Sequence, residues 1–235
     1  MKNIILQHYD GELGEIEKES IKNIKGYAKF VGAEYELVTG RAFRENLSHW
    51  ACQKMCMLDE RWDEYDDLLM LDIDMFVPKS MKENVFDVKG IGLYTDTQKM
   101  LHRKIVNMYP IIASVNAPYW GGAIYKLSRA MRKKLRKQLG GDESWMLNFN
   151  KRWNFGDEGI MHVLAYRAGI TMKTPDIFTD KKWCQDSFLP NPEKAGFIHI
   201  RKKIKPGGPE QEKIDNLRSL QKAGIVERQY HEPLG

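Results

Sequence analysis

The sequence predicts a single α/β domain with a parallel sheet and helical crossovers. First, short apolar runs of strand length alternate with segments of helical periodicity through residues 3–77, a pattern typical of parallel sheets. Second, 42% of the 235 residues are hydrophobic and 29% are charged, which supplies enough core for one large domain or two small ones. Third, the apolar run at residues 68–77, LLMLDIDMFV, is interrupted by two carboxylates, Asp72 and Asp74.

Hydrophobic periodicity assigns the elements of the first half. Apolar residues on one side of residues 15–31 indicate a helix, and Gly40 closes a short strand. Ser48 is a suitable N-cap for a second helix. In chain order, the expected elements are a strand at 3–9, a helix at 15–31, a strand at 34–38, a helix at 48–62 and a strand at 68–77.

The second half carries weaker signals. Residues 119–127, YWGGAIYKL, predict a strand entered through two glycines, where the backbone can approach a ligand closely. Residues 100–115 have no clear assignment. The other expected elements are a strand at 91–94, a very basic helix at 128–139, a helix at 155–168, a strand at 197–200 and, from residue 209, a polar helix with a frayed end.

The two aspartates of the apolar run are the strongest functional signal. Side chains alternate along a strand, so Asp72 and Asp74 would share one face of an extended chain. An unpaired buried carboxylate is costly, so a pair at a strand end indicates a function. Two hard oxygen ligands suit Mg²⁺ or Mn²⁺, with phosphate oxygens completing the coordination shell. The alternative is a pair of solvated loop aspartates.

Other polar side chains follow the expected strands at the same edge. The carboxyl ends of parallel strands meet at one edge of a sheet, and ligands bind beyond that edge. We therefore expect His8, Tyr9 and Thr39 to gather there with Asp72 and Asp74.

Composition excludes several classes of protein. No run approaches the roughly 18 apolar residues of a membrane span, and the N-terminal residues lack the features of a signal peptide. The three cysteines form no disulfide framework, and Cys52 and Cys56 lie at helical spacing among apolar neighbours, which favours a reduced core over a zinc site. We expect a cytoplasmic protein. The net charge of +5 suits an anionic ligand or a membrane surface, and we expect no nucleic-acid partner.

Taken together, residues 3–206 resemble the GT-A glycosyltransferases, in which Asp72-Ile73-Asp74 would be the D-x-D motif. The resemblance implies a GT-A fold, a Rossmann-like nucleotide-binding mixed sheet flanked by helices. It also implies transfer of a sugar from a nucleoside-diphosphate sugar, with UDP as the default carrier, to a hydroxyl of a glycan or other acceptor. The expected organisation is a catalytic domain at 1–206, with a nucleotide-sugar half at 1–97 and an acceptor half at 98–206, followed by a helical tail at 207–235.

A second signature is His199 followed by Lys205 and Pro206, spaced H-x5-K-P. It is similar to the closing motif of the retaining glycogenin-like and lipopolysaccharide galactosyltransferase families. The resemblance implies that His199 is a third metal ligand with Asp72 and Asp74, and that Lys205 contacts the diphosphate. The chain differs from those families at Lys202, where a glycine is usual. The alternative is a strand-end histidine before a solvated basic run.

A third signature joins Trp120-Gly121-Gly122-Ala123 with Gly156-Asp157-Glu158. It resembles the retaining blood-group-type transferases, in which a Gly-Gly strand edge and an acidic pair flank the donor sugar. This implies that Gly121 and Gly122 bind the donor, that Glu158 is the nucleophile or charge stabiliser, and that Asp157 binds a sugar hydroxyl. The alternative is that the acidic pair only favours the helix dipole.

The resemblance also implies donor contacts for three further residues. Lys54 would lie near the donor phosphates, and His8 and Tyr9 would contact the base and ribose, with Tyr9 stacking on the base. The corresponding alternatives are a surface lysine and a plain strand-end aromatic. A sugar-binding platform for the acceptor is expected from one of four tryptophans, Trp50, Trp120, Trp153 and Trp183.

The basic helix at 128–139 is expected to be a solvated face. Peripheral contact with anionic lipid is the alternative, and it would fit a lipid-linked acceptor.

Two other classes of function remain open. The D-x-D segment resembles the first motif of haloacid-dehalogenase phosphatases, although Phe76 replaces the usual threonine or valine and Met161 stands where a later aspartate is expected. A non-catalytic module that binds nucleotides or glycans would also have such a sequence. Release of phosphate would identify a phosphatase, and donor binding without turnover would identify the module.

Overall fold

The computed structural model describes residues 1–90, 105, 107, 120–141, 144–149, 156–170, 183–202 and 210–230. Within these residues the main sheet has four strands in the order β2-β1-β3-β5. Its first strand, β1, pairs in parallel with β2 and β3, and β3 pairs antiparallel with β5. The bounds of the strands are Asn3–Tyr9 for β1, Glu34–Thr39 for β2, Asp67–Leu71 for β3 and Ile124–Ser128 for β5. The predicted α/β fold with a mixed sheet is confirmed.

A smaller sheet of three short strands continues from the main one. It has the order β4-β7-β6, in which β4 is Met75–Phe76, β7 is Phe197–His199 and β6 is Cys184–Asp186. The pairing is antiparallel between β4 and β7 and parallel between β6 and β7. The chain therefore leaves the main sheet at the end of β3 and joins the second sheet after three intervening residues.

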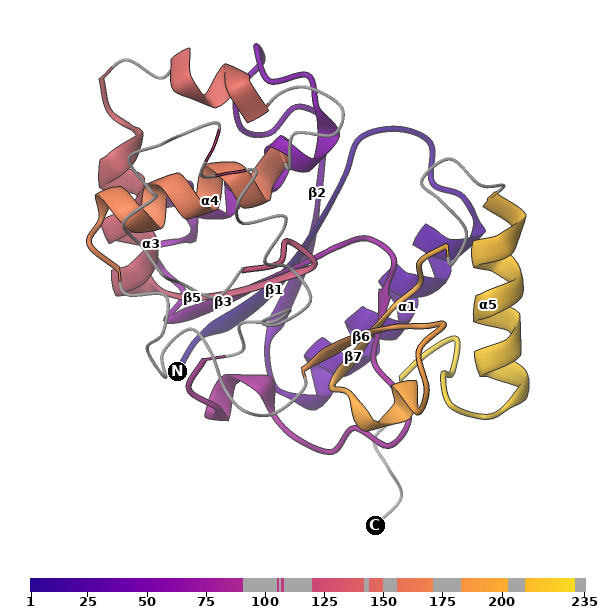
Figure 1. Cartoon of the computed structure of the whole chain (residues 1–235). Helices are drawn as coiled ribbons and strands as arrows, with labels where there is room; N and C mark the ends of the chain where they lie inside the picture. Colours follow the sequence, from indigo (N-terminus) through magenta and orange to yellow (C-terminus); the bar gives the residue numbers. More distant parts are fainter. Residues whose placement is uncertain are drawn as a thin grey trace.

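Helices cover both faces of the main sheet (Figure 1). The helices α3 (Arg129–Arg136) and α4 (Gly156–Arg167) lie on one side, and α1 (Glu15–Phe30) lies on the other with α5 (Glu210–Lys222) beside it. Shorter 3₁₀ helices connect these elements: η1 (Trp50–Leu58), η2 (Glu60–Trp62), η3 (Val85–Asp87), η5 (Lys137–Leu139), η6 (Ser144–Phe149) and η7 (Pro192–Lys194).

The core lies in two layers because side chains alternate along the strands. Ile4 and Met70 face a cluster with η1 and α4, whereas Ile5 and Leu69 face a cluster with α1 and the second sheet. Strands buried on both faces explain why the sequence shows continuous apolar runs.

The predicted α-helix at residues 48–62 is wrong in type. The segment forms the two 3₁₀ helices η1 and η2, and the N-cap is His49, whose ring accepts from the backbone N–H of Ala51, rather than Ser48. Every residue of η1 after Trp50 is buried. Buried positions all round the segment give a continuous apolar pattern that fits either kind of helix.

The basic helix α3 is only partly solvated. Ser128 caps it, and Lys133, Lys134 and Lys137 are exposed as expected. In contrast, Arg132 is fully buried and donates to three backbone carbonyls, those of Leu127, Trp62 and Tyr65. Buried donors need acceptors, so this arginine fixes α3 against the loops beside β3.

The segment after α5 is packed against α1 rather than frayed. Tyr230 is buried, and its ring meets the ring of Tyr27 edge-to-face at 5.5 Å between centroids. A Cβ at Gly26 would lie 2.3 Å from the carbonyl oxygen of Tyr230. Only glycine at position 26 therefore permits this approach.

Several expectations lie outside the described residues: the strand at 91–94, most of 100–115, Trp153, Lys205 and Pro206. The strand predicted at 119–127 begins at Ile124, after the two glycines. None of the helices in the described parts of the chain is both long and apolar enough to cross a membrane.

Candidate functional site

The D-x-D segment forms a turn between the two sheets. β3 ends at Leu71, and the amide of Met75 donates to the carbonyl of Asp72 at 3.3 Å. The side-chain amide Nε2 of Gln7 also donates to that carbonyl, at 3.0 Å. The expectation of an extended chain through both aspartates is wrong, because the backbone changes sheets here. Their carboxylates nevertheless converge.

His199 reaches the aspartates through the pairing of the second sheet. It stands opposite Met75 in the antiparallel ladder, and the amide of Ile200 donates to the carbonyl of Asp74 at 3.0 Å. Its Nε2 atom lies 3.0 Å from Oδ1 of Asp74 and 3.7 Å from Oδ2 of Asp72. Residues distant in the chain thus form one cluster, with their ligand atoms all within 4.8 Å of one another.

The electrostatics of the cluster keep Asp74 ionised. Burial favours the neutral carboxyl, but His199 and Lys213 outweigh it and hold the pKa of Asp74 well below its ordinary value. Asp74 is 8% exposed, so it is not a solvated loop aspartate. Two carboxylates and an imidazole are a suitable donor set for Mn²⁺ or Mg²⁺, so the residues fit the expected metal.

Lys54 is buried in the site. Its Nζ atom lies 2.5 Å from Oδ1 of Asp72 and 2.8 Å from Oδ2 of Asp157, and it donates to the carbonyl of Gly122 at 2.8 Å. These three acceptors match the three donors of an ammonium group. Burial works against the charge, but Asp157 and Asp72 hold the pKa of Lys54 above its ordinary value. The alternative of a surface lysine is wrong.

The acidic pair of α4 lies against the glycines before β5. The amide of Gly122 donates to Oε1 of Glu158 at 2.8 Å, and the hydroxyl of Tyr125 donates to Oδ2 of Asp157 at 3.0 Å. A Cβ at Gly122 would lie 2.4 Å from that Asp157 oxygen. Burial raises the pKa of Asp157, against the opposing effect of Lys54. Lys54 therefore joins the D-x-D turn to the start of α4.

Two residues that sequence reasoning missed complete the arrangement. His162 of α4 accepts from the amide of Trp120 at 3.0 Å and so fixes the chain just before buried Gly121 and Gly122. Lys213 of α5 lies with Nζ 2.6 Å from Oδ2 of Asp74. The spacing of Lys213 one turn before the apolar Leu217 places both on the same side of the helix, but it does not indicate what that side contacts.

His8 and Tyr9 lie at the carboxyl end of β1, as predicted. His8 is buried, and its Nε2 lies 2.7 Å from the carbonyl of Gly40. Burial lowers the pKa of His8, which keeps the ring neutral and makes Nε2 the donor. Tyr9 is half-buried beside Thr39 and donates to the carbonyl of Glu12 at 3.3 Å. A role for either residue in nucleotide binding stays a prediction.

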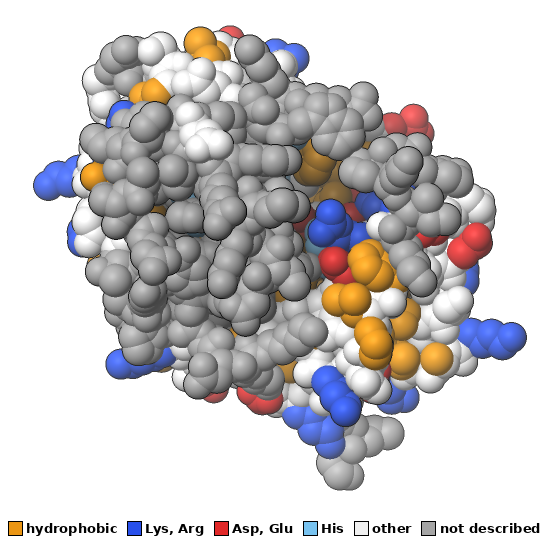
Figure 2. All heavy atoms as spheres, viewed as in Figure 1, with side chains coloured by type: hydrophobic (Ala, Val, Ile, Leu, Met, Phe, Trp, Pro, Cys, Tyr) orange, Lys and Arg blue, Asp and Glu red, His pale blue; other side chains and the backbone are white. Residues whose placement is uncertain are grey.

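Figure 2 shows a hollow to the right of centre on one face of the molecule. In it, Lys or Arg side chains lie beside Asp or Glu side chains, and hydrophobic side chains border it. A surface on which charges of both signs meet suits an anionic ligand that arrives with a cation.

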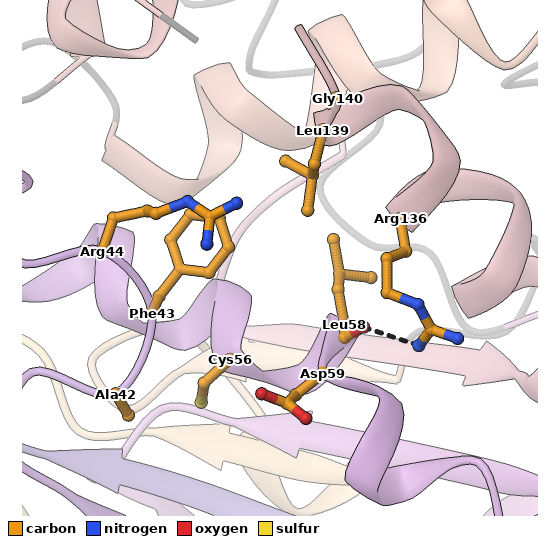
Figure 3. Close-up of a pocket in the computed structure, with 9 residues that line it drawn as sticks. All are labelled: Ala42, Phe43, Arg44, Cys56, Leu58, Asp59, Arg136, Leu139 and Gly140. Atoms are coloured by element: carbon orange, nitrogen blue, oxygen red, sulfur yellow. Dashed lines mark hydrogen bonds between the residues drawn. The ribbon is translucent and has the colours of Figure 1, made fainter.

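A separate cavity of about 320 Å³ lies beside η1 (Figure 3). Arg136, the last residue of α3, borders it and donates to the carbonyl of Leu58 at 2.9 Å. The guanidinium of Arg44 lies 5.1 Å from the ring centre of Phe43. Its lining includes neither the aspartates nor any other predicted site residue. The cavity is therefore separate from the candidate metal ligands.

Comparison with known proteins supports the fold. No protein-family model and no curated protein sequence matches the chain. The chain is similar in structure to a solved glycosyltransferase involved in the glycosylation of the major capsid of PBCV-1, with a TM-score of 0.55 and 10% sequence identity. The match covers 94% of this chain and 100% of the other. The two proteins share a single-domain α/β fold with a mixed sheet flanked by helices. At 10% identity, the similarity shows the fold alone.

Proposed function

We propose that the chain is a metal-dependent glycosyltransferase that moves a sugar from a nucleoside-diphosphate sugar, with UDP as the carrier, to a hydroxyl acceptor. The observation that carries the proposal is the convergence of Asp72, Asp74 and His199 in a fold shared with a known glycosyltransferase. A D-x-D triplet alone is weak evidence for a metal site, because short acidic triplets are common. A histidine that reaches the triplet from a distant strand makes the evidence more specific.

Asp72, Asp74 and His199 would hold Mn²⁺ or Mg²⁺. When bound, the cation would neutralise the charge that develops on the departing diphosphate. Lys205 would add a second positive charge to that leaving group. His8, Tyr9, Gly121 and Gly122 would contact the donor.

Glu158 is the proposed nucleophile or charge stabiliser beneath the donor sugar. Its Oε1 accepts from the backbone amide of Gly122, which fixes the carboxylate beside the glycines that would contact the donor. Asp157 would bind a sugar hydroxyl, and transfer would retain the anomeric configuration. If configuration is instead inverted, Asp157 or Glu158 must act as general base.

Trp50 is the proposed platform for the acceptor. Trp120 and Trp183 are buried, whereas Trp50 is 63% exposed and its ring is stacked on that of His49 with centroids 5.5 Å apart. The His49 ring also borders Gly156, since a Cβ there would lie 3.2 Å from Nδ1 of His49. An exposed indole beside the start of α4 suits a glycan or lipid-linked sugar. The exposed lysines of α3 would serve contact with anionic lipid.

A donor screen tests this function. The protein is incubated with sugar nucleotides and Mn²⁺, and release of nucleoside diphosphate is measured. We expect release with one donor, loss of release in chelator, and faster release when the right acceptor is added. Release of inorganic phosphate from p-nitrophenyl phosphate instead would indicate a phosphatase, and donor binding without turnover would indicate a binding module. Either result would reject the transferase.

A further inference from the structure

The ammonium group of Lys213 pairs with Asp74, one of the three candidate metal ligands. Nζ of Lys213 is 2.6 Å from Oδ2 of Asp74, and Nε2 of His199 is 3.0 Å from Oδ1. One oxygen of the Asp74 carboxylate therefore contacts the ammonium of Lys213 on α5, and the other contacts the ring nitrogen of His199 on β7.

The packing of α5 helps to place Lys213 beside Asp74. Leu217 and Leu220 of α5 are buried in a cluster with Phe76, Ile198 and Ile200. An ion pair between Arg218 and Glu15 also connects α5 to α1. The helix therefore presents Lys213 to the site, one turn before Leu217, whatever else Asp74 binds.

We propose that Lys213 is a resident counter-ion of the metal site, which competes with the divalent cation for Asp74 until a diphosphate is bound. An ammonium at hydrogen-bond distance neutralises the carboxylate and repels a second cation placed beside it. The carboxylates of the site can therefore stay ionised without a metal, because Lys54 forms an ion pair with Asp72 and Lys213 forms one with Asp74. The inference rests on the proposed metal role of Asp72, Asp74 and His199.

A diphosphate changes this balance because it offers new partners to the lysine. The side chain of Lys213 is 20% exposed, and Oε1 of Glu210 lies 4.0 Å from its ammonium, so the ammonium can leave Asp74 without being left unpaired. Phosphate oxygens held by the metal would accept it in turn. Binding of metal and of diphosphate would then be coupled, each increasing the affinity for the other by the same factor.

The test is a titration of Mn²⁺ with and without UDP, followed by the electron paramagnetic resonance signal of free Mn²⁺. Lys213→Met removes the charge and keeps the apolar stem, and Lys213→Arg keeps the charge. Lys222→Met is the matched control, since Lys222 is exposed on the same helix and its loss changes the net charge equally. Circular dichroism and thermal unfolding verify that each variant is folded.

We expect Lys213→Met to bind Mn²⁺ without UDP about tenfold more tightly than the wild type, the effect of one charge-assisted hydrogen bond. In this variant UDP should strengthen Mn²⁺ binding less than it does in the wild type. Lys213→Arg and Lys222→Met should behave as the wild type does.

Two outcomes would overturn the inference in different ways. If the wild type binds Mn²⁺ with UDP and Lys213→Met binds Mn²⁺ alone no more tightly than the wild type, Lys213 is not a competitor and the proposed function stands. If neither protein binds Mn²⁺ under any condition, the metal site itself is rejected, and the inference with it.

Discussion

The ammonium group of Lys54 lies 2.8 Å from a carboxylate oxygen of Asp157, and both side chains are buried. Because the same ammonium also meets Asp72, one lysine connects η1, the D-x-D turn and the start of α4. This places the candidate metal ligands and the candidate catalytic pair in one rigid unit.

Replacing Lys54 by methionine should destabilise the protein strongly. Asp72 and Asp157 would lose their shared cation, and breaking a buried ion pair by removing one partner costs about 3–5 kcal/mol. Urea unfolding measures the free energy. The double variant Lys54→Met/Asp157→Asn should recover part of the loss, because one of the two carboxylates is then neutral.

The control for Lys54 is a surface pair of similar length. Lys79 lies 2.9 Å from Glu227, and its side chain is 62% exposed. Lys79→Met should change the free energy of unfolding by less than about 1 kcal/mol. Equal effects of the two substitutions would show that the Lys54 cluster has no special role.

Gly122→Ala should displace the acidic pair. The new Cβ would lie 2.4 Å from Oδ2 of Asp157 and 2.9 Å from Cγ of Glu158, so both side chains must shift. We expect donor turnover to fall about 100-fold, since misplacement of catalytic groups by an ångström has such effects, and stability to fall by about 1–3 kcal/mol. Gly140→Ala is the matched control, because nothing lies within 4 Å of a Cβ there. Undiminished turnover in Gly122→Ala would argue against a role for Glu158 and Asp157.

Asp74→Ala should abolish Mn²⁺ binding and Mn²⁺-dependent release of nucleoside diphosphate while leaving the fold intact. The variant removes the carboxylate that lies between His199 and Lys213. Asp215→Ala, at an exposed position on α5, should retain both properties. Full turnover of Asp74→Ala in chelator would remove the metal from the mechanism.

His8 should make stability depend on pH. Burial lowers the pKa of folded His8 from its ordinary value of 6.5, so below that pH the unfolded chain binds a proton that the folded protein does not. The contribution of neutral His8 is therefore complete above pH 6.5, and it is lost as the pH falls from there through the lower pKa of the folded protein. His8→Gln, which keeps a donor for Gly40, should lose stability less steeply over this window. The comparison is made by urea unfolding at a series of pH values, and parallel curves for the two proteins would contradict the prediction.

The first strands could be predicted well because their signals are local. β1 has the predicted bounds, and β2 differs by one residue, since apolar runs closed by turn residues specify short buried strands. The turn at Asp72 could not be predicted this way. Met75 and Phe76 continue the apolar pattern but pair with β7, and nothing local indicates a change of sheet.

The predicted metal ligands lie together, and Lys54, expected near the donor phosphates, lies beside them. The partners of Lys54 and Lys213 could not be predicted from local patterns. Lys54 sits in a segment whose apolar neighbours fit an α-helix as well as the observed 3₁₀ helix, so its direction was undetermined. Lys213 belongs to a helix rich in charged residues that resembles an ordinary surface helix. Its contact with Asp74 spans 139 positions, and only the packing of α5 creates it.

The close approach of Gly26 to Tyr230 has a practical consequence for anyone producing this protein. A recombinant version trimmed before residue 210 would lose Val226 and Tyr230 from two core clusters, besides α5 itself, and would expose apolar surface that favours aggregation. A purification tag is better fused ahead of Met1, which is 93% exposed, than behind a segment whose backbone touches α1.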